Sequence, residues 1–328
     1  MKKFAGELAP LILTVVLLSA LSHLWAGPKA IAWISLDRIH AVIWFATLFV
    51  IGYAFTTLIE SGMRSRDFIV DDSGQVDMRA LWRAIPRNPL TGIMSAMLLG
   101  YGVIASTSLV EIYRTSANVW YDAMLWNAEE PLFRFLMGSW LDAPAVWDRI
   151  YFMIWPYLFL AFALVFRITN TQRFILLTMA FVISFYLTDV INLMFPTAGP
   201  AFYRPELFHL AGTNSSQAQE ILRHYMAGEV LQNGMIPGTK AMPSLHVGLT
   251  GMVAWFVARE KLWTLWLLAP WLLLTWLSTV MLGWHYALDG PGGLAVTWVS
   301  VVIARIIQLF WQRSAAHLMG RNRCIQEG

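Results

Sequence analysis

The sequence has little charge and almost no cysteine. Of its 328 residues, 13% are charged and 58% are hydrophobic, whereas soluble domains carry about 25% charged residues. This shortage of charge excludes an ordinary soluble domain and indicates an integral membrane protein. The single cysteine, Cys324, excludes an intrachain disulfide and carries no information about the redox compartment.

A strong imbalance of charge is also missing. The 23 Lys and Arg residues exceed the 20 Asp and Glu residues by only +3, and they are spread along short connections rather than gathered in a block. This spread is typical of membrane topology and not of nucleic-acid binding. We therefore expect the bilayer as a partner and no nucleic acid.

Long apolar runs make up most of the chain. Spanning a bilayer takes about 20 apolar residues, and lipid does not tolerate irregular backbone, so each run is expected to be a helix. The runs cover about 8–26, 39–60, 90–112, 147–167, 173–195, 243–258, 262–283 and 289–312. The sequence predicts an all-α, polytopic transmembrane helix bundle with about eight membrane helices. The first run is longer than the apolar part of a signal peptide, so we expect it to be a retained anchor.

The basic residues fall in alternate connections between these runs. They lie at residues 2–3, 64–87, 167–173, 259–261 and 313–323. The positive-inside rule predicts that these ends are cytoplasmic, which includes the polar loop 61–89. The connections 27–38, 113–146, 196–242 and 284–288 are then expected to face outward. We expect a multi-pass protein of a bacterial inner membrane.

The segment 113–146 mixes apolar and charged residues. Trp120, Trp126 and Trp140 alternate with Asp122 and Glu129. Two interpretations are open: a helix that lies in the membrane interface and covers a site, or a simple belt of interfacial aromatic residues.

The sequence Pro243-Ser244-Leu245-His246 opens an apolar run. Proline is favoured in the first turn of a helix, so a helix is expected to begin here. Its free N–H groups and the positive end of its dipole form an anion site. Ser244 adds a hydroxyl donor, and His246 lies within the first turn.

His285 and Asp289 are four residues apart where the last membrane run begins. Their side chains can share a helix face, and the carboxylate can orient the imidazole and leave one ring nitrogen as a nucleophile or base. The alternatives are an Asp cap beside an interfacial His, or a metal site that adds His246. The metal site lacks further ligand spacing, so we expect no metal. Asp189 and Asn192 lie within the fifth run, where they either line the pocket or form an interhelix hydrogen bond.

These motifs support a resemblance to a known family. Pro-Ser-Leu-His at 243–246 and Ser278-x6-His285-x3-Asp289 resemble the second and third motifs of the type-2 phosphatidic acid phosphatase superfamily. They are most similar to the branch of inositol phosphorylceramide synthases. The resemblance covers residues 146–312, and it implies a six-helix phosphatase-like catalytic core there. Residues 1–145 would then be N-terminal helices with a loop and an interfacial segment, and 313–328 a cytoplasmic tail.

The resemblance also implies roles for residues. His285 would attack phosphorus and form a phosphohistidine, Asp289 would hold His285, and His246 would protonate the leaving oxygen. Arg204 and Ser244 would bind the phosphate, and no cofactor or metal is implied.

Two positions depart from the family pattern. Thr197 stands where the first motif has lysine, and Thr279 follows Ser278 where the third motif has arginine. Lys240 is expected to replace one of these cations. Fewer cations disfavour a dianionic monoester relative to a diester, which favours head-group transfer.

We therefore expect a lipid phosphatase or phospho-head-group transferase that acts on an anionic lipid phosphate and is similar to an inositolphosphotransferase. The acceptor, water or an alcohol, is open. The alternative is a membrane transporter that uses the His and Asp groups as a proton relay. Transporters place such groups near the middle of the bilayer, often between repeated halves. Here the groups lie at helix ends and no repeat is visible, which favours the enzyme.

Overall fold

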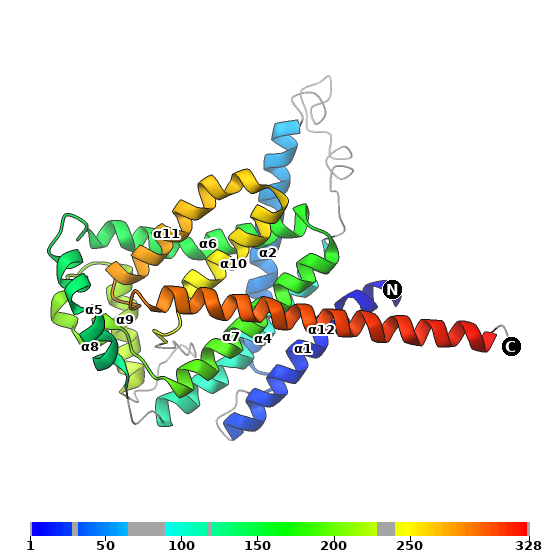
Figure 1. The fold of residues 1–328 in the computed structure, drawn as a ribbon, viewed down its shortest axis with the longest axis horizontal. Coiled ribbons are helices and arrows are strands. Elements are labelled where there is room, and N and C mark those ends of the chain that lie inside the picture. Colours follow the sequence, from blue (N-terminus) through cyan, green and yellow to red (C-terminus); the bar gives the residue numbers. More distant parts are fainter. Residues whose placement is uncertain (1, 28–31, 65–88, 117–119, 228–239, 327–328) are drawn as a thin grey trace.

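The computed structural model describes residues 2–27, 32–64, 89–116, 120–227 and 240–326, which form a bundle of helices without strands (Figure 1). The long helices are α1 (Lys2–Ala26), α2 (Leu36–Arg64), α4 (Leu90–Ser116), α6 (Pro144–Ile168), α7 (Thr171–Met194), α11 (Leu265–Met281) and α12 (Asp289–Gln326). The shorter ones are α5 (Asp122–Met137), α8 (Pro200–Tyr203), α9 (Asn214–Met226) and α10 (Leu245–Glu260). The predicted all-α membrane bundle is confirmed.

Seven of the described helices are long and apolar enough to cross a membrane: α1, α2, α4, α6, α7, α12 and the span Leu262–Met281 that ends with α11. The remaining predicted run, 243–258, forms α10, which has 16 residues. A helix of this length is shorter than the roughly 20 residues of a typical span. It packs between α6, α11 and α12, and most of its residues are buried.

The connection 196–242, predicted to face outward, contains a helix that the apolar runs did not predict. Its polar stretch around Asn214 forms the start of this helix, α9. Thr213 Oγ1 accepts a hydrogen bond from Ser216 N at 3.0 Å, and side chains of this kind are favoured at helix N-termini. The helix α12 also continues past the predicted end at 312. Most of the predicted cytoplasmic loop 61–89 lies outside the described residues.

The core is centred on α7, which contacts α1, α4, α10 and α12. Aromatic residues fill much of it: the ring of Phe174 packs 4.7 Å from that of Phe162 and 4.9 Å from that of Phe166, measured between centroids. The N-terminal helices α1, α2 and α4 pack on α6 and α7. They are thus part of one bundle with the C-terminal helices.

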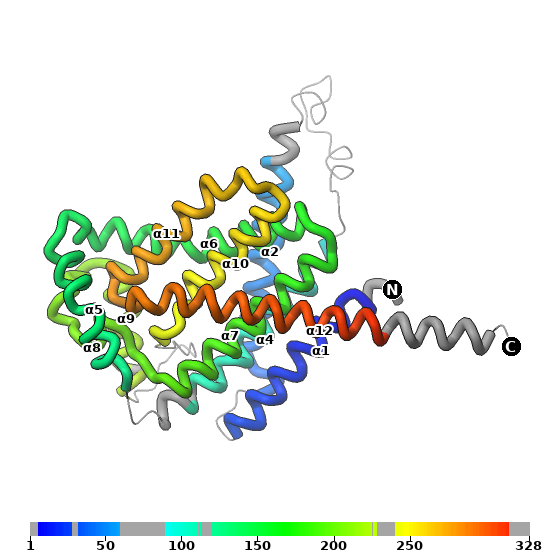
Figure 2. Tube along the Cα trace, in the orientation of Figure 1, coloured from blue at the N-terminus to red at the C-terminus, as the bar shows by residue number. Residues whose placement is uncertain are grey.

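The short elements gather at one end of the bundle. Figures 1 and 2 show α5, α8 and α9 together where α11 ends and α12 begins. Backbone N–H groups at Ala198, Ser215 and Leu288 bond to side chains of α5 and α6 at this end. The described parts of the connections 113–146, 196–242 and 284–288 therefore meet there.

Candidate active site

Two glycines let the chain bring the sequence motifs together. Gly283, in the turn before His285, has φ +66°, and an added Cβ would lie 2.5 Å from Cβ of Ala201. Gly293, in the second turn of α12, would place a Cβ 1.9 Å from the carbonyl oxygen of Ser244. Since only glycine suits a left-handed backbone or so close an approach, these positions allow the start of α10 to lie against the start of α12.

The structure brings both predicted histidines and the aspartate together. Nδ1 of His246 lies 3.3 Å from Nε2 of His285, and Oδ2 of Asp289 lies 3.5 Å from Nδ1 of His285. His285 is 3% exposed and Asp289 is fully buried. Within the described ranges, no group of three or more His, Cys, Asp and Glu side chains could hold a metal ion.

The hydrogen bonds fix the proton positions on both rings. Nδ1 of His285 contacts the main-chain carbonyl of Ala241, which can only accept, so Nδ1 carries the proton. In the neutral ring Nε2 then carries the free lone pair, and Nδ1 of His246 must donate a hydrogen bond to it. This leaves Nε2 of His246 to accept from the hydroxyl of Tyr151, at 3.1 Å. The network therefore directs the lone pair of His285 toward His246.

Burial keeps His285 neutral. Loss of solvation lowers the pKa of its imidazole from 6.5 to about 4, and the bond to Ala241 opposes this shift only in part. The charged form of a ring is disfavoured where burial removes it from solvent. A neutral imidazole with a directed lone pair is a nucleophile at ordinary pH.

Ser244 lies at the N-terminus of α10, beside the histidines. Its backbone N–H donates to the Asp289 carbonyl at 2.9 Å. Its hydroxyl is fully buried and has no hydrogen-bond partner among the described residues. The N–H groups of a first helical turn also lack intrahelical acceptors. Together these donors provide a place for an anionic oxygen.

The predicted cations, Arg204 and Lys240, contact acidic side chains. Arg204 is 48% exposed in its side chain, lies 3.9 Å from Glu206 and covers the ring of Tyr203. Its contacts are with these neighbours rather than with the histidines. Lys240 forms an ion pair with buried Asp189 and directly precedes the residue that binds His285.

Two threonines occupy the positions where the family has cations, and both accept hydrogen bonds from main-chain N–H groups. The hydroxyl of Thr197 accepts from Met242 N at 2.9 Å, and its carbonyl accepts from Ala241 N at 3.2 Å. The carbonyl of Thr279 accepts from the N–H groups of Trp284 and His285, at 3.0 and 3.2 Å. Both positions therefore support the loops that carry the nucleophile, and they add no charge.

Sequence reasoning missed three buried carboxylates that bind loop backbone. Asp122 accepts from Ala198 N and Gly199 N, both at 2.9 Å. Glu129 accepts from Ala287 N at 2.6 Å and from Leu288 N at 2.8 Å. These carboxylates are 3% and 6% exposed. They are seven residues apart on α5, and this two-turn spacing is the signal in the sequence that would have placed them on one helix face.

The third carboxylate comes from α6. Asp148 accepts from Asn214 N and Ser215 N, at 3.0 and 2.9 Å, and so holds the start of α9. The Tyr286 hydroxyl adds a bond to Asp122 at 2.9 Å. Burial, and then the charge of Asp122, raise the pKa of Tyr286 well above its usual range, so it stays a donor. Of the two interpretations of segment 113–146, these contacts favour a helix that covers the site.

Aromatic side chains enclose His246. The ring of Tyr151 stacks on Trp284 with centroids 5.6 Å apart. The rings of Trp155 and His246 pack edge to face, with their centroids 5.5 Å apart. Tyr151 and Trp155 come from α6, and the sequence did not indicate either of them as a site residue.

Comparison with known proteins gives one match. The family model described as the PAP2 superfamily matches residues 121–303. The matched segment begins just before α5 and ends within α12, and it includes all the site residues described above. No curated protein and no solved structure matches the chain.

Proposed function

Because this chain belongs to the PAP2 superfamily, we propose that it is an integral membrane enzyme that transfers the phosphoryl or phospho-head group of a lipid through a phosphohistidine on His285. The observation that carries the proposal is the 3.3 Å contact between the Nε2 lone pair of His285 and His246 Nδ1. Family membership supports phosphatase-type activity on a lipid phosphate.

The proposed reaction has two displacements. A bound phosphate oxygen takes over the hydrogen bond from His246 and so frees Nε2 of His285. Binding of the anionic phosphate beside His246 favours protonation of its ring. Nε2 of His285 then forms a bond to phosphorus while the bond from phosphorus to the leaving oxygen breaks, and the His246 imidazolium gives that oxygen its proton. An acceptor hydroxyl next attacks phosphorus and loses its proton to His246, and the N–P bond breaks.

The remaining groups stabilise charge. The Ser244 hydroxyl and the start of α10 are suited to the equatorial oxygens. The phenol of Tyr151 can donate to the neutral ring of His246 and accept from the imidazolium, so it serves both states. Arg204 and Lys240 remain the proposed cations for the phosphate, although Arg204 lies beside Glu206 and Lys240 pairs with Asp189 in this structure.

The charge of the site favours a monoanionic substrate. Thr197 and Thr279 leave two family cation positions neutral, and the charge of Lys240 is offset by Asp189. A phosphodiester carries one negative charge and needs less compensation than a monoester dianion. We therefore include in the proposal a head-group transfer similar to that of an inositolphosphotransferase, at the outward face that the positive-inside rule predicts.

A labelling experiment tests the nucleophile. Purified protein is incubated with phosphate-labelled phosphatidic acid, prenyl diphosphate and phosphatidylinositol, each with water or with a lipid alcohol as acceptor. Wild type is expected to carry an acid-labile, base-stable label with at least one donor, and His285→Ala is expected to carry none. His209→Ala changes an exposed histidine and is the matched control. Labelling and turnover of His285→Ala at the wild-type rate would exclude the assignment.

The transporter alternative receives less support. A proton relay for transport is expected near the middle of the membrane, whereas His246 and His285 lie at the start of α10 and in the turn before α12. Proton-coupled uptake into proteoliposomes that is lost in His285→Ala, without phosphoryl transfer, would reverse this preference.

A further inference from the structure

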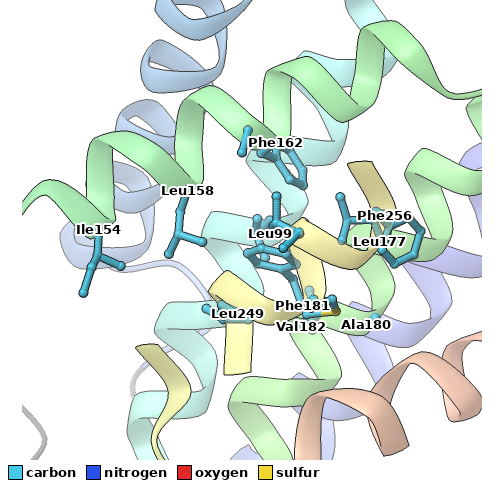
Figure 3. Packing of buried hydrophobic residues seen from close by; sticks show 14 of the residues in the cluster. Leu99, Ile154, Leu158, Phe162, Leu177, Ala180, Phe181, Val182, Leu249 and Phe256 are labelled. Atoms are coloured by element: carbon cyan, nitrogen blue, oxygen red, sulfur yellow. The ribbon is translucent and has the colours of Figure 1, made fainter. Parts of the chain in front are cut away.

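A groove lies between α10 and α12, on the side of α10 that faces away from the hydrophobic core. Figure 3 shows Leu249 and Phe256 of α10 in the core beside residues of α6 and α7. Gly251 and Trp255 lie on the opposite face of this helix, and three residues of α10 and six of α12 line the groove. About 390 Å³ of the groove is open to the centre of a water-sized sphere, whereas a single water needs only about 10–15 Å³ by this measure. The groove can therefore hold a ligand much larger than water.

The lining of the groove is apolar except for Thr297 and Arg305. The Thr297 hydroxyl donates to two carbonyls of its own helix, both at 3.0 Å. Trp255 is 43% exposed and Trp298 is 69% exposed, so the groove is open along one side. Its walls suit a hydrocarbon chain, which packs on them through dispersion contacts.

Arg305 places a positive charge at one end of these walls. It lies inside the membrane span Asp289–Ser314, and its side chain forms no hydrogen bond or ion pair with the described residues. The carboxylate at the end of α10, Glu260, already pairs with Arg173. A charged side chain inside a membrane span normally has a partner or marks a site. Arg305 is therefore suited to an anionic ligand.

Arg305 lies near the end of the bundle opposite the active site. Three residues further along α12, Gln308 donates to the carbonyl of Gln172 at the start of α7, at 2.8 Å. From Arg305 the lining extends back along α12 to Leu294, a distance of about 16 Å at 1.5 Å per residue. A hydrocarbon core is about 30 Å thick, so one leaflet is about 15 Å deep. The groove thus matches the depth of one leaflet, with its cation at the head-group end.

We propose that this groove binds an anionic phospholipid of the leaflet opposite the active site, an inference that goes beyond the proposed function. The phosphate lies at Arg305, and one hydrocarbon chain follows the groove between Trp255 and Trp298 toward the middle of the membrane. Arg259, whose guanidinium covers the Trp255 ring at 5.0 Å, adds a second positive charge next to this wall. Basic pockets between membrane helices bind anionic head groups in this way. The lipid contacts both α10 and α12, the two helices that begin at the active site.

Photolabelling tests where the lipid binds. Wild-type protein in detergent is mixed with phosphatidylglycerol that carries a diazirine in the middle of one chain, and mass spectrometry locates the crosslinks. Label is expected on residues 251–255 and 294–302, and unlabelled phosphatidylglycerol is expected to compete for this label better than phosphatidylcholine with the same chains. Equal competition by the two lipids, or label spread evenly over the exposed faces of all spans, would overturn the proposal, because either result indicates only ordinary lipid contacts.

Removing the cation tests the head-group end. Arg305 is exposed, so Arg305→Gln is expected to keep the melting temperature. The phosphatidylglycerol concentration for half-maximal competition is expected to rise about tenfold or more, because a charge-assisted bond is lost. Arg313→Gln removes the same charge from the same helix outside the groove, and this matched control is expected to change that concentration less than about twofold. Arg305→Lys is expected to keep most of the affinity. Equal weakening in Arg305→Gln and Arg313→Gln would indicate a general effect of charge and reject the site.

A further variant tests the chain end. Val301 lines the groove and is partly buried, so Val301→Phe narrows the groove and leaves Arg305 in place. Phosphatidylglycerol is expected to bind this variant about threefold or more weaker, since part of the chain loses its burial. Unchanged affinity would reject the groove as the site of the chain. These measurements need no turnover, so their failure is distinct from the absence of a phosphoenzyme, which would count against the proposed function alone.

Discussion

His285 donates from Nδ1 to the main-chain carbonyl of Ala241. A main-chain carbonyl therefore fixes the tautomer of the proposed nucleophile, although Oδ2 of Asp289 lies 3.5 Å from the same nitrogen. Oδ2 of Asp289 instead accepts from Tyr286 N at 2.7 Å. Oδ2 of Asp289 therefore holds the turn that carries His285, and we propose a second, separable role, in which the Asp289 carboxylate stabilises the ring when the ring becomes cationic.

A substitution can remove the carboxylate charge of Asp289 and keep the shape of the side chain. Asp289→Asn keeps an oxygen for the N–H of Tyr286, so the protein is expected to fold with a melting temperature close to that of wild type. The rate of phosphoenzyme formation is expected to fall by about 100-fold or more, as in other sites where such a carboxylate stabilises an imidazolium. Rapid-quench labelling measures the rate. A wild-type rate would show that Ala241 alone is sufficient.

The low pKa of His285 predicts an unusual acid limit. The nucleophile must be neutral, and its protonated fraction becomes large only as the pH falls through about 4, instead of through 6.5. The acid limb of single-turnover labelling is therefore expected to have its midpoint near pH 4, while the need for a protonated His246 makes labelling fall as the pH rises. His246 and Asp289 face the same ring, so the profile is recorded in Asp289→Asn too. A wild-type midpoint near 6.5 would contradict the role of burial.

Tyr151 offers a test of the general acid. Tyr151→Phe removes the hydroxyl that meets His246 at 3.1 Å and leaves the ring stacked on Trp284. Turnover is expected to fall by about tenfold to 100-fold with little change in KM, because proton transfer slows while substrate contacts remain. Tyr157→Phe on the same helix is the control, because the buried Tyr157 hydroxyl has no hydrogen-bond partner among the described residues. Equal effects of both changes would reduce Tyr151 to a packing residue.

Local motifs allowed the central part of the site to be predicted. His246 follows a helix start and His285 lies four residues before Asp289, and short spacings of this kind determine which side chains share a helix end. The helices were predictable for a similar reason, since a run of apolar residues has one stable form in lipid. The predicted start of a helix at 243 agrees with α10, which begins at Leu245.

The supporting contacts could not be predicted because they join distant parts of the chain. Glu129 meets Leu288 across 159 residues, and nothing near either residue in the sequence specifies that pairing. The start of α9 at Asn214 could not be predicted from its polar residues, because residues that cap helices also favour turns. The exposed position of Arg204 depends in the same way on how α8 folds against its neighbours.

Glu129 is expected to support both stability and rate. It accepts two backbone N–H groups within three residues of His285, and Glu129→Gln replaces one acceptor by a donor. An unsatisfied buried group costs about 1–3 kcal/mol, so thermal stability falls, and turnover is expected to fall more than KM changes. Glu130→Gln is the matched control, since Glu130 pairs with Arg134 on a more exposed part of α5 and its change is expected to stay within about 0.5 kcal/mol. The prediction fails if the two variants behave alike.

Lys240 is the hardest residue to interpret by single substitution, because it pairs with Asp189, which is 2% exposed. Lys240→Met leaves that carboxylate without its cation, and breaking a buried pair in this way costs about 3–5 kcal/mol. The single variant is therefore expected to lose activity through instability whatever its role with substrate.

The double variant Asp189→Asn, Lys240→Met separates the two roles. Neither side chain is then charged, so most of the stability lost in Lys240→Met is expected to return, as measured by thermal unfolding in detergent. If Lys240 also helps to hold the phosphate, the double variant keeps an elevated KM, and Asp189→Asn alone, which leaves the lysine unpaired near His285, lowers KM instead. Because the two single changes act oppositely on charge at the site, opposite shifts in KM would indicate electrostatic contact with substrate. A double variant with wild-type stability and wild-type KM would restrict Lys240 to holding the loop of Ala241.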